Sequence, residues 1–436
     1  MKINLENLKN YFKKNRMFKN ILLIISGSVF SRVITLLLSP VITRIYSPED
    51  YGILSMYSAI LGMISLIGAL SYDNAILIEE DDEEAINIFV LCVLLIFSTT
   101  IIFLIIFYLK GESILKLLKA SKLGVYGYFI PLGFFLTGIH TIISSWTFRK
   151  RNFKSITMTK YVQSITGNGS KIILGLLKFH SVGLLAGQLL NKISGIITLG
   201  YSSFREIKGL LKYVKKYKIL KMAGRYKEFP MYSFPGLLLL SVSSQISVIF
   251  ISALYGSKEV GLFGLAMSVT FLPVGIIGKS VQDVFCAEAA RCGKKNADKI
   301  KELSIELLKK LFILAIIPLI IIVWQGPFLF SFVFGEKWFR AGVYSRCLSI
   351  YVFSHFMIHP VSVIFQILER QKNSFILSLC KLIIVLLVFY VAKVLKLSSL
   401  KAVFIYSLGM TIIEIFKLIL SQKVINEEIL KNESNE

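Results

Sequence analysis

Several charged side chains lie inside long apolar stretches of this sequence, and these are the residues that could do chemistry. Lipid does not tolerate an unpaired charge, so an ionisable residue at membrane depth faces protein or water and marks a binding site or an ion pathway. Cations dominate the set, and a positively charged, water-filled lumen would attract an anion such as a phosphate or pyrophosphate. We therefore predict that this anion is bound by Arg32, Lys171, Lys279, Arg346 and Lys381.

Fewer acidic residues lie in the apolar stretches, and they are candidates for coupling to an ion gradient. Lys279 and Asp283 are four residues apart, so they could pair within one helix and be structural. Glu414 and Lys417 are three apart and could pair in the same way. Asp73 has no partner at helical spacing and is the better candidate for binding a cation or proton. The predicted ion-coupling residues are Asp73, Asp283 and Glu414.

Structural alternatives exist for several of these residues. Arg32 could pair with Asp73 on an adjacent span. His355 and His359 share a helix face because they are four residues apart, whereas His140 is expected to be a hydrogen-bonded packing residue. Long basic side chains near a membrane surface can also extend to the interface, and this alternative stays open for Lys171, Arg346 and Lys381.

The composition is that of a polytopic membrane protein. Of the 436 residues, 55% are hydrophobic and 17% are charged, and the mean hydropathy is +0.70. Apolar stretches of roughly twenty residues, the length that spans a bilayer, recur along the chain. A β-barrel would instead show alternating segments of ~10 residues. The sequence predicts an all-α protein with about twelve transmembrane helices, at 20–43, 50–78, 85–109, 125–147, 155–177, 181–201, 230–254, 259–285, 304–324, 341–366, 374–395 and 399–421.

Basic loops predict the orientation and account for the net charge of +24. Clusters at 9–19, 149–154, after 204 and at 291–299 all fall on one side, so both termini are expected to be cytoplasmic. Nucleic acid is not needed to explain these residues, whereas contact with membrane lipids is expected. No stretch between the spans is long enough for a folded soluble domain.

The predicted domains are an N-terminal lobe at 1–203, a connector at 204–229, a C-terminal lobe at 230–421 and a cytoplasmic tail at 422–436. The connector is predicted to be a basic amphipathic helix. Its apolar residues Phe204, Ile207, Leu211 and Val214 fall on one face, and four lysines crowd the other. It could recognise phosphorylated lipid headgroups, or it could be a solvated linker.

The five cysteines are scattered, without CxxC or metal-ligand spacing, at positions 92, 286, 292, 347 and 380. We therefore expect no disulfide framework, no metal and no bound cofactor.

An internal repeat divides the chain into two halves. Residues 46–52 (YSPEDYG) have a counterpart at 255–261 (YGSKEVG), an offset of 209. Ser47 and Pro48 form a helix-start signature, and small and polar residues from Ser55 to Asp73 fall on one face of the predicted second span. Six spans per repeat imply two six-helix lobes related by a pseudo-two-fold axis along the membrane normal.

Twelve spans, two halves, Arg32 in the first span and the corner RIYSPEDYGILS at 44–55 resemble Wzx-type polysaccharide flippases. These are O-antigen or capsule repeat-unit translocases of the multidrug/oligosaccharidyl-lipid/polysaccharide exporter superfamily. The resemblance implies translocation of undecaprenyl-pyrophosphate-linked oligosaccharide across the bacterial cytoplasmic (inner) membrane by alternating access, without enzymatic activity. A proton or sodium gradient, a polysaccharide polymerase and chain-length proteins are implied partners. Arg32 matches the family by position, whereas the other four cations match only in kind.

Two other functions are compatible with the sequence. A multidrug or cation antiporter of the same fold would be expected to use acidic residues for cationic drugs, whereas the buried set here is mainly basic. A membrane-bound polysaccharide polymerase or ligase should need a sizeable outer loop, and the loops here are short.

Overall fold

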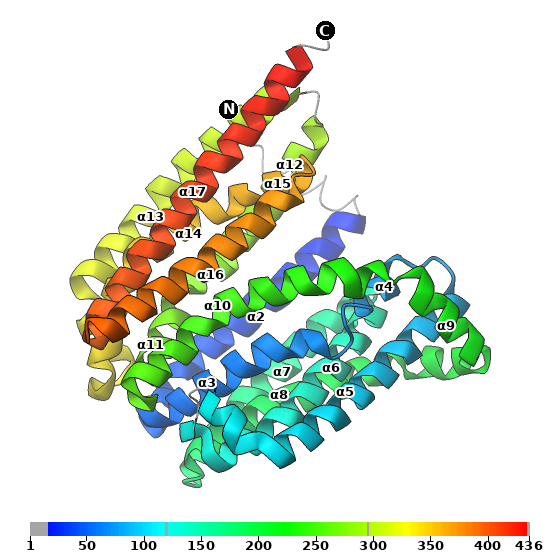
Figure 1. Cartoon of the computed structure of the whole chain (residues 1–436), viewed down its shortest axis with the longest axis horizontal. Helices are drawn as coiled ribbons and strands as arrows, with labels where there is room; N and C mark the ends of the chain where they lie inside the picture. Colours follow the sequence, from blue (N-terminus) through cyan, green and yellow to red (C-terminus); the bar gives the residue numbers. More distant parts are fainter. Residues whose placement is uncertain (1–15, 118–120, 294–295, 434–436) are drawn as a thin grey trace. The chain divides into compact units, whose positions relative to one another are not determined.

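The computed structural model describes residues 16–117, 121–293 and 296–433, and these form helices without a strand (Figure 1). Three parts of the sequence-based predictions lie outside the described residues. These are the basic residues between 9 and 14, Lys294 with Lys295, and the last three residues of the tail.

The described residues of the first half, through the connector, form eight α-helices and three 3-10 helices. They are α2 (Arg16–Ile45), α3 (Pro48–Ile64), η1 (Ser65–Ile67), α4 (Asp73–Ile78), α5 (Asp82–Leu117), η2 (Ser121–Tyr128), α6 (Phe129–Arg149), α7 (Phe153–Leu176), α8 (His180–Leu210), η3 (Leu211–Tyr213) and α9 (Lys216–Arg225).

The second half begins with a π-helical turn and contains longer helices. They are η4 (Phe229–Ser233), α10 (Phe234–Tyr255), α11 (Ser257–Thr270), η5 (Val274–Gly278), α12 (Lys279–Cys292), α13 (Ala297–Phe334), η7 (Glu336–Trp338), α14 (Phe339–Ile358), η8 (His359–Val363), α15 (Ile364–Ile367), α16 (Gln371–Val394) and α17 (Ser399–Glu433).

Ten of the described helices are long and apolar enough to cross a membrane, or eleven spans if the bent pair α11 and α12 counts as one. The prediction of an all-α, multi-pass membrane protein is therefore confirmed. Helix α7, which corresponds to the predicted span 155–177, is 24 residues long but is not among these ten. Its lysines, hydroxyls and amides make it the more polar partner of the apolar helices beside it.

Helix α3 starts as the sequence predicts. The Ser47 hydroxyl accepts a hydrogen bond from the Asp50 backbone N–H at 3.1 Å, and the Asp50 carboxylate accepts one from the Ser47 N–H at 3.0 Å. Pro48 is the first helical residue, where its missing N–H costs nothing. This reciprocal cap satisfies amides that the first helical turn would otherwise leave without partners.

The predicted span 50–78 is not one helix. Regular α-helix ends at Ile64, and the chain then passes through Leu70 and Ser71, whose φ angles of 48° and 64° lie in the left-handed region. The Thr99 hydroxyl donates to the Gly68 carbonyl at 3.3 Å, replacing part of the lost helical bonding. Asp73 begins a separate helix, so it does not share one continuous helix face with Ser55.

The second copy of the repeat breaks at the equivalent place. Helix α11 ends at Thr270, and π-helical turn η5 begins at Val274, which is 209 residues after Ser65, the start of η1. Pro273 lies in this break, and the helices on either side are bent by 45°. The predicted span 259–285 is therefore a broken span, and the two copies share their interruption as well as their start.

Helices α3 and α11 cross so closely that glycine is required on both. A Cβ on Gly52 would lie 1.9 Å from the carbonyl oxygen of Ser257, and a Cβ on Gly261 would lie 1.7 Å from the carbonyl oxygen of Pro48. Gly52 and Gly261 are 209 residues apart, and so are Pro48 and Ser257. The two contacts are therefore exchanged by the repeat, as a local two-fold axis requires.

The chain separates into two compact units built from discontinuous segments. The first contains 1–42, 64–111 and 126–235, and the second contains 43–63, 112–125 and 236–436. In the first unit, α7 and α8 lie side by side over most of their length (Figure 1). In the second, α13 packs along α14, and α14 along α17. The predicted linear lobe boundaries at 203 and 230 stay a prediction.

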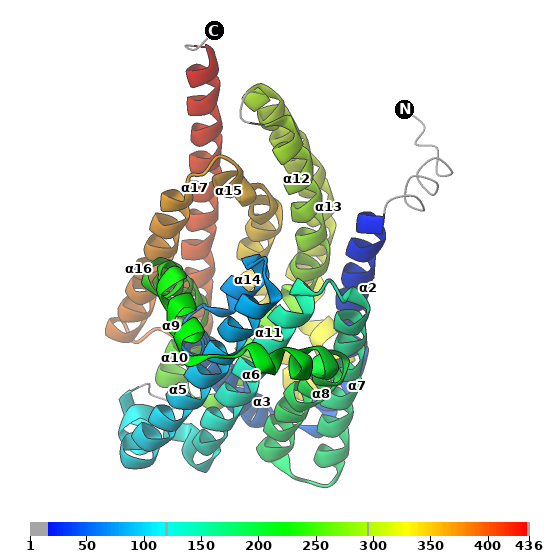
Figure 2. The ribbon, with the colours of Figure 1, turned by 90° about the vertical axis from the view of Figure 1, so that its right-hand side faces the viewer.

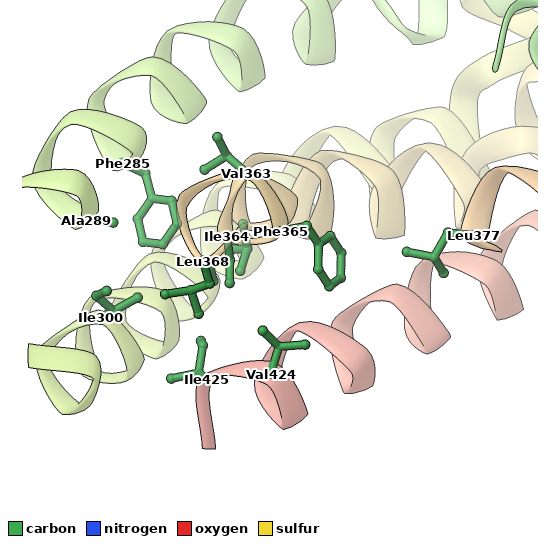
Figure 3. Packing of buried hydrophobic residues seen from close by; sticks show 11 residues of the cluster. Phe285, Ala289, Ile300, Val363, Ile364, Phe365, Leu368, Leu377, Val424 and Ile425 are labelled. Atoms are coloured by element: carbon green, nitrogen blue, oxygen red, sulfur yellow. The ribbon is translucent and has the colours of Figure 1, made fainter. Parts of the chain in front are cut away.

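Apolar packing in the second unit joins six helical segments, which are α12, α13, η8, α15, α16 and α17. Figure 2 shows α12 and α13 side by side. Both η8 and α15 pack against α12. Figure 3 shows the side chains directed toward one another, with Ile364 near the middle of the cluster. The cluster comprises Phe285, Ala289, Ile300, Val361, Val363, Ile364, Phe365, Leu368, Leu377, Val424 and Ile425.

An acid–base clasp in the first unit joins the acidic run at 79–84 to helix α9. Glu83 pairs with Lys218 at 3.2 Å, and Glu84 pairs with Lys221 at 3.1 Å. Arg225 pairs with Glu84 at 2.8 Å and with Glu79 at 3.0 Å. The acidic run lies between spans on the side that the basic loops predict to be cytoplasmic. It pairs there with basic side chains of α9.

Glu79 is the buried centre of the clasp, with 4% of its surface exposed. Burial acts to raise the pKa of its carboxyl. Hydrogen bonds from the Tyr226 hydroxyl at 2.8 Å and from backbone N–H groups, together with the Arg225 charge, outweigh that effect and lower the pKa. The folded protein therefore favours the charged form of Glu79 more than the unfolded chain does.

The connector is two helical segments rather than the one predicted amphipathic helix. Helix α8 continues to Leu210, and regular helix resumes only at Lys216. Between them Val214 and Lys215 are extended. The Asn87 side chain fixes this bend, because it accepts from the Lys215 N–H at 3.1 Å and donates to the Tyr213 carbonyl at 3.3 Å.

Placing a methyl group at the crossing should destabilise the protein. We expect Gly52→Ala to lower the free energy of unfolding by about 1–3 kcal/mol, the range for overpacking, because its Cβ meets a carbonyl oxygen. The control is Gly200→Ala in α8, where a Cβ meets nothing within 4 Å. Thermal unfolding in detergent measures both, and equal melting temperatures would contradict the close crossing.

Lowering the pH should weaken the attachment of helix α9 to the acidic run at 79–84. Because the pKa of Glu79 is lowered on folding, its stabilisation is present above the ordinary carboxyl pKa and is lost as the pH falls through the folded value. At neutral pH, Glu79→Gln should speed hydrogen exchange in α9 roughly ten-fold, equivalent to about 1.4 kcal/mol. Exchange measured by mass spectrometry, corrected for intrinsic rates, tests both statements. Glu80→Gln, an exposed neighbour, is the control, and equal effects would contradict the clasp.

Candidate functional site

A polar stripe on α2 is joined to α7 inside the first unit. The Asn168 amide donates to the Thr35 hydroxyl at 3.1 Å, and the Ser164 hydroxyl donates to the Ser31 carbonyl at 3.0 Å. Farther along, the Thr157 hydroxyl donates to the Leu23 carbonyl at 2.9 Å. The polar groups of both helices therefore satisfy one another over several turns.

Two cations meet on this stripe. Arg32 is exposed on α2, and Lys160 of α7 contacts the same helix at Ser28, four residues before Arg32. Lys160 donates there to the Ser28 hydroxyl. Among the described residues, no carboxylate forms an ion pair with either cation, and the alternative Arg32–Asp73 pair is not formed. Two like charges held together without a counter-ion are an arrangement suited to an anion.

Lys160 was missed by the sequence analysis. Residues 160, 163, 164, 167, 168 and 171 follow helical three- and four-residue spacing, so the signal for a second polar stripe was present. The predicted Lys171 lies at the far end of this series, where it donates to the Gln188 side chain of α8 at 3.4 Å.

The stripe continues onto α6 and α8 through amide and imidazole groups. The Gln163 amide nitrogen lies 3.1 Å from His140 Nε2, and the Asn191 amide donates to the Gln163 carbonyl at 2.7 Å. His140 is therefore hydrogen-bonded, as predicted. Gly187 of the predicted GxxxG pattern also packs closely, because a Cβ there would lie 2.4 Å from Lys171 Cγ.

The second unit contains a cavity of about 550 Å³ that brings two predicted site residues, Lys381 and Glu414, together with other polar side chains. They come from far apart in the sequence, on α14, η8, α16 and α17. Its polar lining consists of Ser244, Tyr351, His355, His359, Ser362, Ser374, Ser378, Lys381, Tyr406, Glu414 and Lys417.

Glu414 is the centre of this lining. It is 4% exposed, and its two carboxylate oxygens contact His355 Nδ1 at 2.9 Å and Lys417 Nζ at 2.7 Å. The predicted pairing of Glu414 with Lys417 is therefore present, with His355 as an additional partner from another helix. Such pairing is what a buried carboxylate requires.

The rest of the lining leaves one positive charge in excess. Lys381 donates to the Ser244 hydroxyl at 3.3 Å. With neutral imidazoles, Lys381, Lys417 and Glu414 sum to +2 − 1 = +1. His359 stacks on His355, with ring centroids 4.6 Å apart. The cavity therefore combines an excess cation with a carboxylate and two imidazoles.

The remaining predicted residues lie outside this cavity lining. Lys279 pairs with Asp283 at 2.9 Å, and both side chains are substantially exposed. Arg346 donates to the Trp324 backbone carbonyl at 3.2 Å. Asp73 is half-buried at the start of α4. The structure thus brings together Lys381 and Glu414 of the predicted set, but not these four.

Tyr351 and Tyr406 are lining residues that the sequence analysis missed. Tyr351, His355 and His359 recur every four residues, which is a usable signal for one helix face. Tyr406 had no such signal, because it comes from a distant helix. No group of three or more His, Cys, Asp or Glu residues suited to a metal ion occurs in the described part of the chain.

Comparison with known proteins identifies related families and folds. The model of a family described as "Polysaccharide biosynthesis protein" matches residues 41–343. No curated protein matches the sequence.

Solved structures of the same fold are transporters and a flippase. An inward-facing multidrug resistance MATE family transporter of the MOP superfamily aligns with a TM-score of 0.75 at 17% identity, covering 92% of this chain and 98% of that chain. The lipid II flippase MurJ in an inward closed conformation aligns at 0.69 and 17% identity, covering 94% and 90%. An outward-facing MATE transporter aligns at 0.61 and 17%, covering 94% and 96%. These likenesses show the fold, including its two-lobe architecture.

Removing the Glu414 carboxylate should strongly destabilise the second unit. We expect Glu414→Ala to lower the free energy of unfolding by about 3–5 kcal/mol, because Lys417 is left as a buried charge without its partner. Glu427→Ala on the same helix removes only an exposed pair with Arg370 and should cost less than about 1 kcal/mol. Chemical denaturation in detergent compares them, and a cost for Glu414→Ala no larger than the control's would refute the buried pairing.

Proposed function

Because this chain belongs to the polysaccharide biosynthesis protein family, we propose that it flips undecaprenyl-pyrophosphate-linked oligosaccharide repeat units across the bacterial cytoplasmic membrane. The coarser statement stands on the findings above: it is a multi-pass membrane protein with the fold of MOP-superfamily flippases and transporters. The finer one, including O-antigen, capsule or a related polysaccharide as the product, is our proposal.

The observation that carries the proposal is the pair of cations on α2 and α7. Lys160 donates to Ser28, one helical turn from Arg32, and neither cation forms an ion pair with a carboxylate among the described residues. A pyrophosphate would supply the missing negative charge, and the arginine fork donates to two of its oxygens at once. Gln163 and Asn191 supply amide groups on the same set of helices, and such groups hydrogen-bond sugar hydroxyls.

The cavity of the second unit supports the same substrate class. Lys381 and Lys417 supply positive charge, and Tyr351 and Tyr406 supply aromatic surface beside hydroxyl groups. Cationic and aromatic groups together suit a sugar linked to phosphate. Lys171, Lys279 and Arg346 remain candidates for contact with substrate on other parts of the path.

We further propose that an ion gradient drives transport by alternating access. Asp73 is the carboxylate best suited to bind the proton or sodium ion. Glu414 and Asp283 are weaker candidates, because they pair with Lys417 and Lys279. No metal or other cofactor is required, and no chemical conversion of the substrate is part of the proposal. Both termini are placed in the cytoplasm, and a polymerase and chain-length proteins would act on the product.

A multidrug or cation antiporter is the second candidate. The MATE fold likeness favours it, and so does the buried acid Glu414. Against it, Glu414 is already paired with Lys417 and lies within hydrogen-bonding distance of His355, and the unpaired charges on α2 and α7 are positive. A polymerase or ligase has less support, because the solved structures of the same fold are transporters and a flippase.

Loss of Arg32 should stop polysaccharide export. A charge-assisted hydrogen bond contributes about 1.5–3 kcal/mol, so Arg32→Ala should reduce surface polysaccharide by roughly ten-fold or more. Membrane protein level, measured by immunoblot, should not change. Arg291→Ala, an exposed arginine at the end of α12, is the control. Normal surface polysaccharide in the Arg32→Ala strain would exclude the anion site.

Asp73→Asn should uncouple transport from the gradient. The amide has nearly the shape of the carboxylate but cannot carry its charge or take up a proton, so uptake of lipid-linked oligosaccharide into vesicles should become insensitive to an imposed proton or sodium gradient. Asp298→Asn, exposed in the first turn of α13, is the matched control. Unchanged gradient dependence in Asp73→Asn would remove this residue from coupling.

A further inference from the structure

Helix α9 is docked on the first unit in one orientation, and this docking decides which face stays free. Lys218, Lys221 and Arg225 are three and four residues apart and all pair with the acidic run at 79–84. Met222 lies on the same face and is completely buried. The Tyr72 hydroxyl also donates to the carbonyl of Ala223 at 2.9 Å. The charged face of the helix is therefore turned inward.

The free face is apolar at its centre. Tyr217 is 62% exposed and Leu220 is 64% exposed, and they lie three residues apart on the side opposite the clasp. Gly224 continues this strip, and a Cβ there would meet nothing within 4 Å. A solvated surface helix shows the reverse pattern, with polar residues outward. Exposed apolar side chains on such a basic helix are typical of a helix that lies in a membrane interface.

The chain itself keeps α9 at the membrane surface. The preceding candidate span ends at Tyr213, and the following one begins at Phe229. Only Val214 and Lys215 separate the first span from α9, and only residues 226–228 separate α9 from the second. Because the apolar span that follows begins directly after residue 228, the end of α9 lies close to the lipid headgroups.

The basic side chains of the connector that do not pair with the acidic run complement anionic lipid. Residues 204–229 contain nine Lys and Arg but only two Asp and Glu, and the clasp occupies three of the nine. The other six are exposed, and none forms an ion pair with a described residue. They are Arg205, Lys208, Lys212, Lys215, Lys216 and Lys227.

We propose that the connector binds the headgroup layer of a bilayer rich in anionic lipid, independently of the transported substrate. Tyr217 and Leu220 insert between headgroups, and the lysines beside them, Lys212, Lys215 and Lys216, contact lipid phosphates. The acidic run at 79–84 orients helix α9 in this arrangement. By binding the other charged face of α9, it turns the apolar strip toward the lipid.

Insertion is tested by placing tryptophan in the strip. Full-length Leu220→Trp protein is reconstituted into liposomes of phosphatidylcholine with phosphatidylglycerol, and the emission added to that of the native protein is measured. The expected result is quenching by lipids brominated near the headgroup end of the chain and protection from acrylamide. Glu80→Trp, an exposed position in the acidic run, should show the reverse. Equal acrylamide access at both positions would overturn the proposal.

Charge recognition is tested by the lipid that stays with the protein. We expect Lys215→Gln with Lys216→Gln to reduce phosphatidylglycerol retained on purification, by about five-fold for each lysine. Lys393→Gln with Lys396→Gln, an equally exposed pair, is the control and should leave retention unchanged. Equal retention in both double variants would overturn the lipid assignment. Protection of Leu220→Trp by soluble polyglutamate but not by liposomes would also overturn it, in favour of an acidic protein partner.

Discussion

A charged side chain inside a membrane protein has to be paired with an opposite charge, hydrated or bound by a ligand. The rest of the structure depends on this constraint. Glu414 meets it with two partners from two helices, and both contacts are shorter than 3 Å. The acidic run at 79–84 meets it by binding helix α9. Arg32 and Lys160 differ, because they lie on one polar stripe and neither forms an ion pair with a carboxylate among the described residues. We propose that a substrate anion binds at this unpaired positive charge.

The second constraint is the contact between the two repeat copies. Gly52 and Gly261 allow α3 and α11 to touch through their backbones, and each glycine meets the residue that starts the other helix. Both copies are then interrupted, and the irregular turns η1 and η5 begin at the equivalent positions Ser65 and Val274. A break at a fixed point in each copy, with polar groups beside it, is characteristic of transporter helices that must bend without exposing backbone to lipid.

Local signals in the sequence predicted the helices well. They could not predict contacts between residues that are far apart in the sequence. The cap of Ser47 and Asp50 and the offset of 209 were readable because each depends on adjacent or repeated residues. The break after Ile64 was not, since Leu70 and Ser71 adopt left-handed angles that their side chains do not favour. In the site, the pair Glu414 and Lys417 was foreseen from spacing, whereas His355 joins it from another helix.

The central claim is that this protein moves a lipid-linked oligosaccharide from one leaflet to the other. The most direct test uses liposomes that contain the purified protein and a fluorescent undecaprenyl-pyrophosphate oligosaccharide in both leaflets. A reductant that cannot cross the membrane destroys only outer-leaflet fluorescence. The account predicts that, with an imposed ion gradient, nearly all fluorescence is lost in protein-containing liposomes and about half in protein-free ones. Loss of the same half in both would contradict the account.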